Sequence, residues 1–200
     1  GGEVDPVATR VAVGAANRPH PGELASGDHW LVEEAAGGLR VSLIDGAGHG
    51  PGAAFAAHAA AAAIADAPTA SVGECLRHAH EALRATRGAV MSVAFVDSAG
   101  ASLALAGVGN VEAALLNGGA ETHPVTQRGM LGLAMPRIRP LTIALGDQWT
   151  LVLYSDGVRG RFTLRAPEFA ALSAQELADA ILRDFARADD DATVVVLRSR

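Results

Sequence analysis

The fold is decided by the segment Val41-Ser42-Leu43-Ile44-Asp45-Gly46-Ala47-Gly48-His49-Gly50-Pro51-Gly52-Ala53-Ala54-Phe55. An apolar run ends in an acid, four glycines follow within seven residues, and an alanine-rich segment begins. This pattern predicts a strand, a tight loop and a helix. The glycines leave little bulk above Asp45, so a backbone carbonyl or a small charged ligand can approach its carboxylate. Taken alone, Asp45-Gly46 is equally compatible with an ordinary turn.

The residues before Asp45 predict an antiparallel hairpin. Residues 29–34 and 39–44 are strand-like, and the turn 35–38 joins them. Pairing across this turn brings Asp28 and Asp45 to the same end of neighbouring strands. An earlier strand is expected at residues 9–16.

Two consecutive helices are predicted after the glycine-rich loop. Pro51 suits the first helical position, and eleven of the fifteen residues from 53 to 67 are alanine. Ser71, with Glu74 three residues later, predicts a capping box for a second helix that runs to about Arg87. Two successive helices are unlike an alternating strand-helix order.

The second half of the chain is predicted to be mainly strands. Strand-like runs separated by turn residues occupy residues 89–96, 101–107, 111–116, 141–145 and 150–154. Residues 123–140 show no clear periodicity and are expected to form a loop, with room for one short strand. Ser173 and Glu176 predict a last helix to about Arg187, and residues 193–197 a closing strand. This order predicts an α+β fold, with two packed sheets and helices outside them.

Composition limits the class of protein. The 200 residues show no linker, so one domain spanning 1–200 is expected. A formal charge of −6 argues against a nucleic-acid partner, and the single cysteine, Cys75, against an internal disulfide. No signal peptide is recognisable at the N-terminus, and the apolar segment 53–65 is shorter than the roughly 18 residues of a membrane span. We therefore expect a cytoplasmic protein without a membrane partner.

Acidic residues recur at predicted strand ends. Asp156-Gly157 follows the apolar run 151–154, and Asp189-Asp190-Asp191 precedes the last strand. Each is individually compatible with a turn or a solvated loop. Acids at 28, 45, 156 and 190 on neighbouring strand ends would repel one another, and divalent cations supply the missing charge. Oxygen-only ligands favour Mg²⁺ or Mn²⁺ over Zn²⁺, and paired ions are suited to phosphate ester hydrolysis.

Five ordered motifs then carry a resemblance over essentially the whole chain. They are Ser26-Gly27-Asp28, Asp45-Gly46-x-Gly48-His49-Gly50, Gly107-x-Gly109-Asn110, Ser155-Asp156-Gly157-Val158 and Asp190-Asp191-Ala192-Thr193. The chain resembles metal-dependent protein serine/threonine phosphatases of the PPM (protein phosphatase type two C) superfamily, and most closely the bacterial SpoIIE-like branch. The resemblance implies a four-layer α-β-β-α sandwich, with two antiparallel sheets flanked by helices.

The resemblance also implies the site. Asp45 would bridge two Mn²⁺ or Mg²⁺ ions, Asp156 and Asp190 would complete one ion site, and Asp28 with the Gly46 carbonyl would serve the other. A bridging hydroxide would attack the phosphorus of phosphoserine or phosphothreonine.

Two assignments within this site stay open. Asp190 fits the spacing to Thr193, with Asp191 as the competing ligand. His49 would protonate the leaving oxygen or orient water, and a loop-packing role is an equal alternative. The motif at residues 107–110 is not assigned a catalytic role.

The expected partner is a phosphorylated STAS-type antagonist or stressosome scaffold, because the chain resembles stand-alone phosphatases of partner-switching modules. Arg159 and Arg161 follow Asp156 closely and are predicted to dock this phosphoprotein, since arginine forms forked bonds with phosphate and carboxylate. Ordinary solvated surface is the alternative for both arginines.

Three rival classes of protein fit the sequence less well. Residues 48–53 match the dinucleotide-binding pattern G-x-G-x-x-A, but the predicted helix leads to another helix rather than to a parallel strand. A zinc hydrolase is disfavoured because His80-Glu81 lacks the second histidine of that motif. A non-catalytic binding module of the same fold is disfavoured by the presence of all four acids.

Overall fold

The computed structural model describes residues 10–200 and contains ten strands in two antiparallel sheets. Sheet I has the strand order β1-β10-β9-β6-β7, and sheet II has the order β2-β3-β4-β5-β8. The strands are β1 (Val11–Arg18), β2 (Asp28–Ala35), β3 (Gly38–Gly46), β4 (Ala89–Asp97), β5 (Ser102–Val108), β6 (Glu112–Asn117), β7 (Ala120–Thr122), β8 (Leu141–Ala144), β9 (Trp149–Tyr154) and β10 (Ala192–Ser199).

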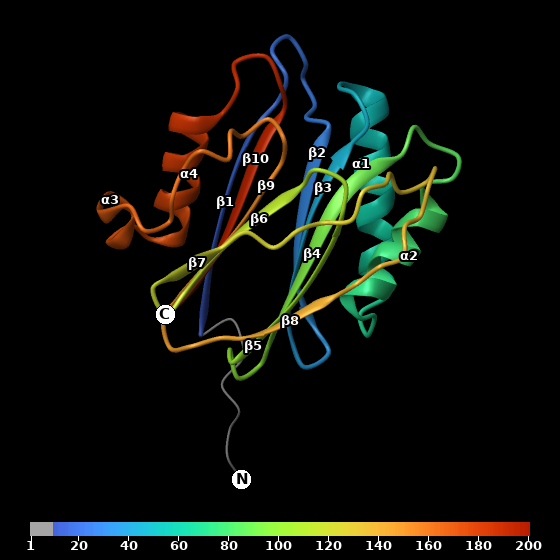
Figure 1. The fold of residues 1–200 in the computed structure, drawn as a ribbon. Coiled ribbons are helices and arrows are strands. Elements are labelled where there is room, and N and C mark those ends of the chain that lie inside the picture. The colour runs from blue at the N-terminus through green and yellow to red at the C-terminus, as the bar shows by residue number, and fades with distance from the viewer. Residues whose placement is uncertain (1–9) are drawn as a thin grey trace.

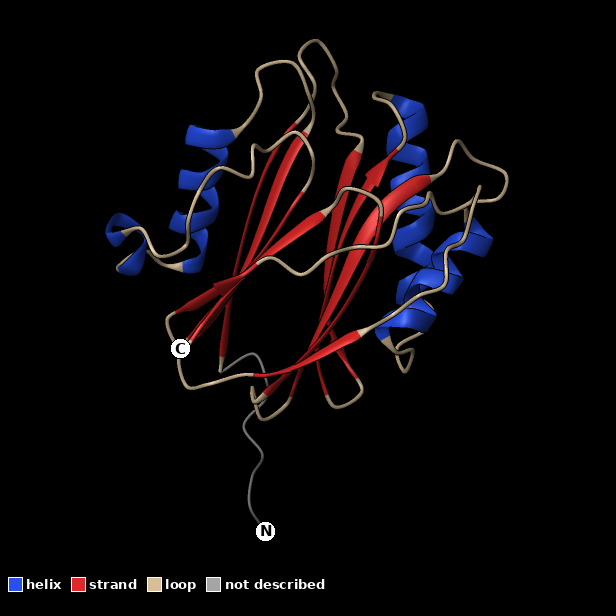
Figure 2. Ribbon diagram, viewed as in Figure 1, coloured by secondary structure: helices blue, strands red, loops and turns tan. Residues whose placement is uncertain are grey.

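The sheets face each other and the helices cover their outer faces (Figures 1 and 2). The helices are α1 (Pro51–Ala65), α2 (Val72–Ala82), α3 (Pro167–Ala170) and α4 (Ala174–Phe185). Helices α1 and α2 pack on sheet II, and α3 and α4 lie on the side of sheet I. This is the predicted four-layer α-β-β-α sandwich.

Alternation along the strands explains the layers. Val41 and Leu43 of β3 and Val195 and Leu197 of β10 belong to the core between the sheets. Their neighbours face outward, so Ile44 packs against α1 and α2 while residues such as Val194 pack against α4. Because successive side chains of a strand point to opposite faces, strands covered on both faces must be apolar almost throughout.

Every pairing between the named strands is antiparallel, which removes the dinucleotide-binding alternative. A dinucleotide-binding unit needs parallel strands joined by a crossover helix. Here α1 leads directly into α2, as predicted. Capping boxes at Ser71 and Ser173 are also confirmed.

Some predicted boundaries were wrong. Helix α2 ends at Ala82 rather than near Arg87, because Thr86 turns the chain: its hydroxyl donates to the Leu83 carbonyl and accepts from the Gly88 amide. Helix α1 ends at Ala65, before Pro68, which disfavours a helical conformation in the residue before it. Short elements β7 and α3 were not predicted, and of the first predicted strand Thr9 lies outside the described residues.

A buried arginine ties α1 and α2 to sheet II. Arg40 of β3 is 1% exposed and pairs with Glu33 at 2.9 Å. Its guanidinium also donates to the carbonyls of Ile64 and Ala67, at the C-terminal end of α1. These acceptors satisfy a buried cation and the carbonyls that a helix end leaves free.

Among residues 10–200, no helix has the length and apolar character needed to cross a membrane.

Candidate active site

The predicted hairpin brings two acids together at one end of sheet II. Strands β2 and β3 pair in the register that makes Asp28 and Asp45 direct partners. The next residue of β3, Gly46, pairs with Ala89 of β4. Asp45 therefore lies on a strand with neighbours on both sides, whereas Asp28 begins the edge strand of the sheet.

The other acids lie at the corresponding end of sheet I. Asp156 follows β9 and Asp190 precedes β10, and these two strands are antiparallel neighbours with Tyr154 opposite Val194. Asp156 and Asp190 each act electrostatically on Asp45. The two sheets thus contribute two acids each to one cluster.

Asp28 joins the two sheets through hydroxyl groups. Its Oδ2 accepts from Ser155 Oγ, just after β9, at 2.6 Å and from Thr193 Oγ1, in β10, at 2.7 Å, and both residues are fully buried. Its Oδ1 is buried and has no hydrogen-bond partner among the described residues. Burial raises the pKa of Asp28 to about 6, with smaller raising effects of Asp191 and Asp156 opposed by the two hydroxyl bonds. One carboxylate oxygen is thus held by the fold and the other is left for a ligand.

Asp45 is the most perturbed of the acids. Burial, followed by the charges of Asp28, Asp156 and Asp190, raises its pKa to about 9. Asp45 and Asp156 are close enough to share a hydrogen bond. The protein without a cation therefore favours a proton on this carboxyl group near neutral pH, as like charges crowded in a partly buried site require.

Asp190 and Asp191 have different surroundings. The pKa of Asp190 is raised by partial burial and next by the charge of Asp156, which identifies it as a neighbour of the cluster. Asp191 is 5% exposed, and its Oδ1 accepts from the backbone amide of His20 at 2.7 Å. Asp190 therefore lies beside Asp156, and Asp191 lies beside Asp28, whose pKa its charge raises. One oxygen of Asp191 is bonded to the loop between β1 and β2, and the other, Oδ2, is buried without a partner among the described residues.

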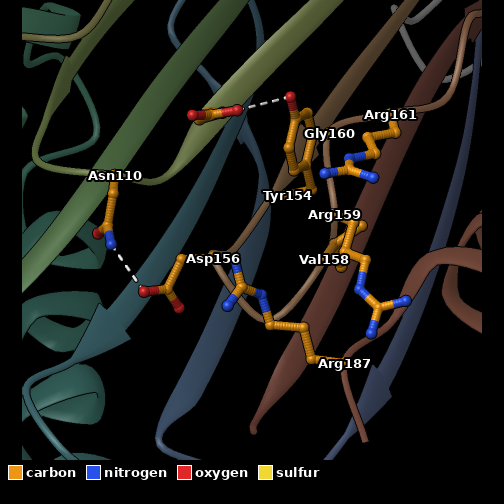
Figure 3. Close-up of a pocket in the computed structure, with 9 residues that line it drawn as sticks. Asn110, Tyr154, Asp156, Val158, Arg159, Gly160, Arg161 and Arg187 are labelled. Atoms are coloured by element: carbon orange, nitrogen blue, oxygen red, sulfur yellow. Dashed lines mark hydrogen bonds between the residues drawn. The ribbon is translucent and has the colours of Figure 1, made fainter.

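Asp156 has a partner that sequence reasoning did not assign. Asn110 Nδ2, from the β5–β6 turn, donates to Asp156 Oδ2 at 2.7 Å (Figure 3). Within residues 10–200, none of Asp28, Asp45, Asp156 and Asp190 forms an ion pair with a basic side chain.

The donor set fits a divalent cation. It consists of carboxylate oxygens, one of them buried and unpartnered, in a cluster whose own negative charge is uncompensated. Within residues 10–200, no group of three or more Asp, Glu, His or Cys side chains is arranged closely enough to hold a metal ion as it stands.

The glycines of the loop after β3 permit close contacts. A Cβ on Gly46 would lie 2.1 Å from the carbonyl oxygen of Ala53, because the start of α1 rests against this strand end. Gly50, the N-cap of α1, has φ +73°, and a Cβ there would meet the carboxylate of Glu23.

His49 lies in the loop between β3 and α1, and its side chain contacts Glu23 and His20. Its Nδ1 lies 3.0 Å from Glu23 Oε1, and its ring stacks on His20 with centroids 4.5 Å apart. With a side chain 58% exposed, His49 faces solvent at the site rather than packing into the core.

A cavity of about 540 Å³ adjoins Asp156 on the side of sheet I. Figure 3 shows Asn110 and Asp156 pointing toward one another, with Arg159 and Arg161 farther from them in the view. The residues that line this cavity include Arg159 and Arg161, and also Arg187, which sequence reasoning did not single out.

Four residues near the site were not assigned a role from the sequence, because their roles follow from tertiary contacts and not from a recognisable motif. Ser155 and Thr193 stand inside two recognised motifs, but only the packing of the two sheets directs their hydroxyls to Asp28. Glu23 and Arg187 lie in loops with no distinctive pattern.

Comparisons with known proteins agree with this geometry. A family profile described as Stage II sporulation protein E (SpoIIE) matches residues 35–200. A solved structure described as "The bacterial stressosome: a modular system that has been adapted to control secondary messenger signaling" is 31% identical, with 94% of this chain and 100% of that chain covered and a TM-score of 0.88. Among curated proteins, none matches by sequence.

Two more distant structures share the fold. RsbX in complex with magnesium is 18% identical, with 96% of each chain covered and a TM-score of 0.85. The PP2C phosphatase domain of SpoIIE from Bacillus subtilis, with a fragment of its regulatory domain, is 21% identical. There, 94% of this chain and 63% of that chain are covered, with a TM-score of 0.76.

The two facing sheets with their outer helices have the fold of PPM-type (PP2C) phosphatase domains. Within that class, the chain belongs to the SpoIIE family.

Proposed function

We propose that this chain is a metal-dependent protein serine/threonine phosphatase. The observation that carries the proposal is the convergence of four carboxylates from both sheets, with the buried Asp28 Oδ1 left without a partner among the described residues. A cluster of this kind is stabilised by divalent cations and has no evident use in a purely structural role.

The residues proposed to hold two Mn²⁺ or Mg²⁺ ions are Asp45 between them, Asp156 and Asp190 on one side, and Asp28 with the Gly46 carbonyl on the other. When bound, the ions would make a water nucleophilic near neutral pH and offset the charge of the phosphoryl oxygens. Ser155 and Thr193 keep Asp28 turned toward the cluster. Hydrolysis of the phosphoester yields the serine or threonine hydroxyl and inorganic phosphate.

His49 is proposed to assist the leaving group. Glu23 engages its Nδ1, so Nε2 is the nitrogen available to exchange a proton with the leaving oxygen or with an ordered water. Glu23 would act as a positioning residue that selects the tautomer.

The proposed substrate is a phosphorylated STAS-domain protein, either an anti-anti-sigma factor or a stressosome component. The likeness to a stressosome-related structure at 31% identity supports this class, and a structure of the RsbU and RsbW domains of Rv1364c from Mycobacterium tuberculosis shares the fold. Such a role is a cytoplasmic one, in stress signalling.

The decisive experiment measures hydrolysis of p-nitrophenyl phosphate and of a phosphorylated STAS-domain protein with Mn²⁺, with Mg²⁺ and with excess chelator. We expect turnover of both substrates that chelator abolishes and added Mn²⁺ restores. Full activity in chelator would refute the metal-dependent mechanism. Metal-dependent binding of the phosphoprotein without turnover would favour the alternative of a non-catalytic binding module.

The substrate-docking role of Arg159 and Arg161 is tested separately. Both line the cavity beside Asp156, where a folded phosphoprotein would extend beyond its phosphate. Replacing both with alanine should slow dephosphorylation of the protein by about tenfold or more and leave p-nitrophenyl phosphate hydrolysis nearly unchanged. The control removes two charges elsewhere, at Arg77 and Arg183, which pair with Glu74 and Asp184. Equal loss on both substrates would contradict a docking role.

A further inference from the structure

Arg87 lies beside the glycine-rich loop although it is distant from that loop in sequence. It comes between α2 and β4, two residues before Ala89, which pairs with Gly46. The amide of Ala47 donates to the carbonyl of Gly88 at 3.0 Å, so the backbone next to Arg87 is bonded to the end of β3. Arg87 is thereby held at the same end of sheet II as Asp45.

The guanidinium of Arg87 packs against Gly48 of the glycine-rich loop and Gly52 at the start of α1. Nη1 donates to the carbonyl of Ala47 at 3.3 Å. A Cβ on Gly52 would lie 2.8 to 2.9 Å from Cζ, Nη2 and Nε, and a Cβ on Gly48 would lie 2.9 Å from Nη1. Any other residue at these positions would displace the guanidinium. Gly52 is helical, so it is this contact rather than a left-handed backbone that accounts for a glycine there.

Arg87 has no acidic partner in the part of the chain that the structure describes. Arg84, three residues earlier, does pair with Glu81, at 2.9 Å. The glycine-rich loop next to Asp45 therefore carries an exposed cation that contacts the loop backbone and is not neutralised by a neighbouring carboxylate. Such a group is ready to bind an anion that enters the site.

We infer that Arg87 binds the phosphoryl group of the substrate. This inference rests on the proposed phosphatase function and names a residue that acts on the phosphate itself. A planar guanidinium can bond two phosphoryl oxygens at once, and its charge offsets repulsion between a phosphate dianion and the acid cluster. The arginines of the cavity beside Asp156 have a different role, because they lie where the rest of a protein substrate would extend.

The two roles make different predictions for the small substrate, p-nitrophenyl phosphate. Phosphate is common to p-nitrophenyl phosphate and to a phosphoprotein, so Arg87→Ala should lower kcat/KM for both by a similar factor of about ten to a hundred, the range for a hydrogen bond between charged groups. The affinity for inorganic phosphate, measured as product inhibition and by calorimetry, should weaken by the same factor. Mn²⁺ affinity should not change.

Three further variants control the experiment. Arg84→Ala removes a neighbouring arginine that is already paired and should leave all these measurements unchanged. Arg87→Lys should recover part of the phosphate affinity, since it retains the charge but not the fork. Gly52→Ala leaves Arg87 in place and favours the helix, so the fold should be kept. Its methyl group would occupy the space in which the guanidinium lies, so phosphate binding should weaken.

Several outcomes would overturn the inference. They are unchanged phosphate affinity in Arg87→Ala, loss confined to the phosphoprotein, and loss of Mn²⁺ affinity that accounts for the whole effect. Phosphate calorimetry on the Mn²⁺-loaded protein does not depend on turnover. If the wild-type protein hydrolyses nothing, the proposed function fails, and the Arg87 inference is still decided by phosphate binding.

Discussion

Asp45-Gly46 and Asp156-Gly157 are the same dipeptide at the same end of the molecule, one at a strand end of each sheet. Asp45-Gly46 ends the apolar strand β3, Asp156-Gly157 comes just after the apolar strand β9, and the backbone of another segment lies close to each glycine. A Cβ on Gly46 would meet the Ala53 carbonyl oxygen at 2.1 Å, and one on Gly157 would meet the Asp191 carbonyl oxygen at 1.8 Å. The two glycines thus serve the same end, which is to let a second chain segment approach the acid.

The two acids nevertheless differ. Asp45 is within an internal strand of sheet II, and burial and three neighbouring acids raise its pKa to about 9. Asp156 lies just beyond its strand, is exposed, and accepts a hydrogen bond from Asn110. The comparison teaches that a strand-end Asp-Gly provides a carboxylate at a defined place, and that the neighbouring strands decide how strongly that carboxylate needs a counter-charge.

The largest expected effect is on catalysis by the acids themselves. Asp45→Asn should reduce Mn²⁺-dependent hydrolysis of p-nitrophenyl phosphate by more than about a hundredfold, the loss typical of removing one key electrostatic group. Asp156→Asn should also reduce it, but by less, because only Asp45 is proposed to contact both ions. Steady-state kinetics at saturating Mn²⁺ compare the two variants. An Asp45→Asn protein with normal turnover would break the assignment of Asp45 as the central ligand.

The glycines test whether the two strand ends are equally crowded. Gly46→Ala and Gly157→Ala should each destabilise the protein by about 1–3 kcal/mol, because the added methyl meets a backbone carbonyl. For a domain of this size, that corresponds to a fall in Tm of about 2–12 °C. Gly146→Ala is the matched control, since its Cβ would meet only Asn117 Oδ1 at 3.5 Å. A wild-type Tm in either site variant would show that the approach is not as close as described.

The acids also differ in their effect on the metal-free protein. In chelator, stability should fall as the pH rises from about 5 to 9, because the raised pKa values of Asp28 (about 6) and Asp45 (about 9) mean that the folded protein holds protons that the unfolded chain has released. This stability is complete below the unfolded-state pKa near 4 and is lost as the pH rises through the folded-state values.

Asp45→Asn should flatten this dependence and stabilise the metal-free protein at pH 8 by at least about 1.4 kcal/mol, the free energy of one pKa unit. Asp156→Asn should fold as well as the wild type or slightly better, since it removes one charge at the exposed edge of the cluster. Urea unfolding at several pH values measures both. Stability that increases toward pH 9 in chelator would contradict the reasoning, as would a large fall in the Tm of Asp156→Asn.

The smallest effect concerns the partner that only Asp156 has. Asn110→Ala should raise the Mn²⁺ concentration for half-maximal activity by about tenfold, the lower end of what loss of an outer partner of a ligand costs. Asn117→Ala is the control, because its amide bonds Ala144 instead. An unchanged Mn²⁺ dependence in Asn110→Ala would mean that the hydrogen bond from Asn110 does not help Asp156 bind the ion. Asp45 and Asp156 would then differ only in how deeply they are buried.

Local patterns predicted much of this fold. The β2–β3 hairpin placed Asp28 opposite Asp45, as expected, because a short turn and two alternating strands determine their own register. The capping boxes of α2 and α4 were likewise readable, since a Ser and a Glu three residues apart satisfy each other's backbone. The end of α2 was not, because a hydroxyl bond at Thr86 and the turn at Gly88 stop the helix where propensity alone would continue it.

By itself, the sequence determined the strand-end acids, the glycines beside them and the antiparallel class of the fold, all of which follow from neighbours in the chain. Only the tertiary structure decided that Ser155 and Thr193 donate to Asp28, that Asp191 Oδ1 accepts from the His20 amide, and that Arg87 lies against Gly48 and Gly52. These contacts join segments far apart in the sequence. Their geometry depends on how two sheets and a helix pair pack, which no local pattern records.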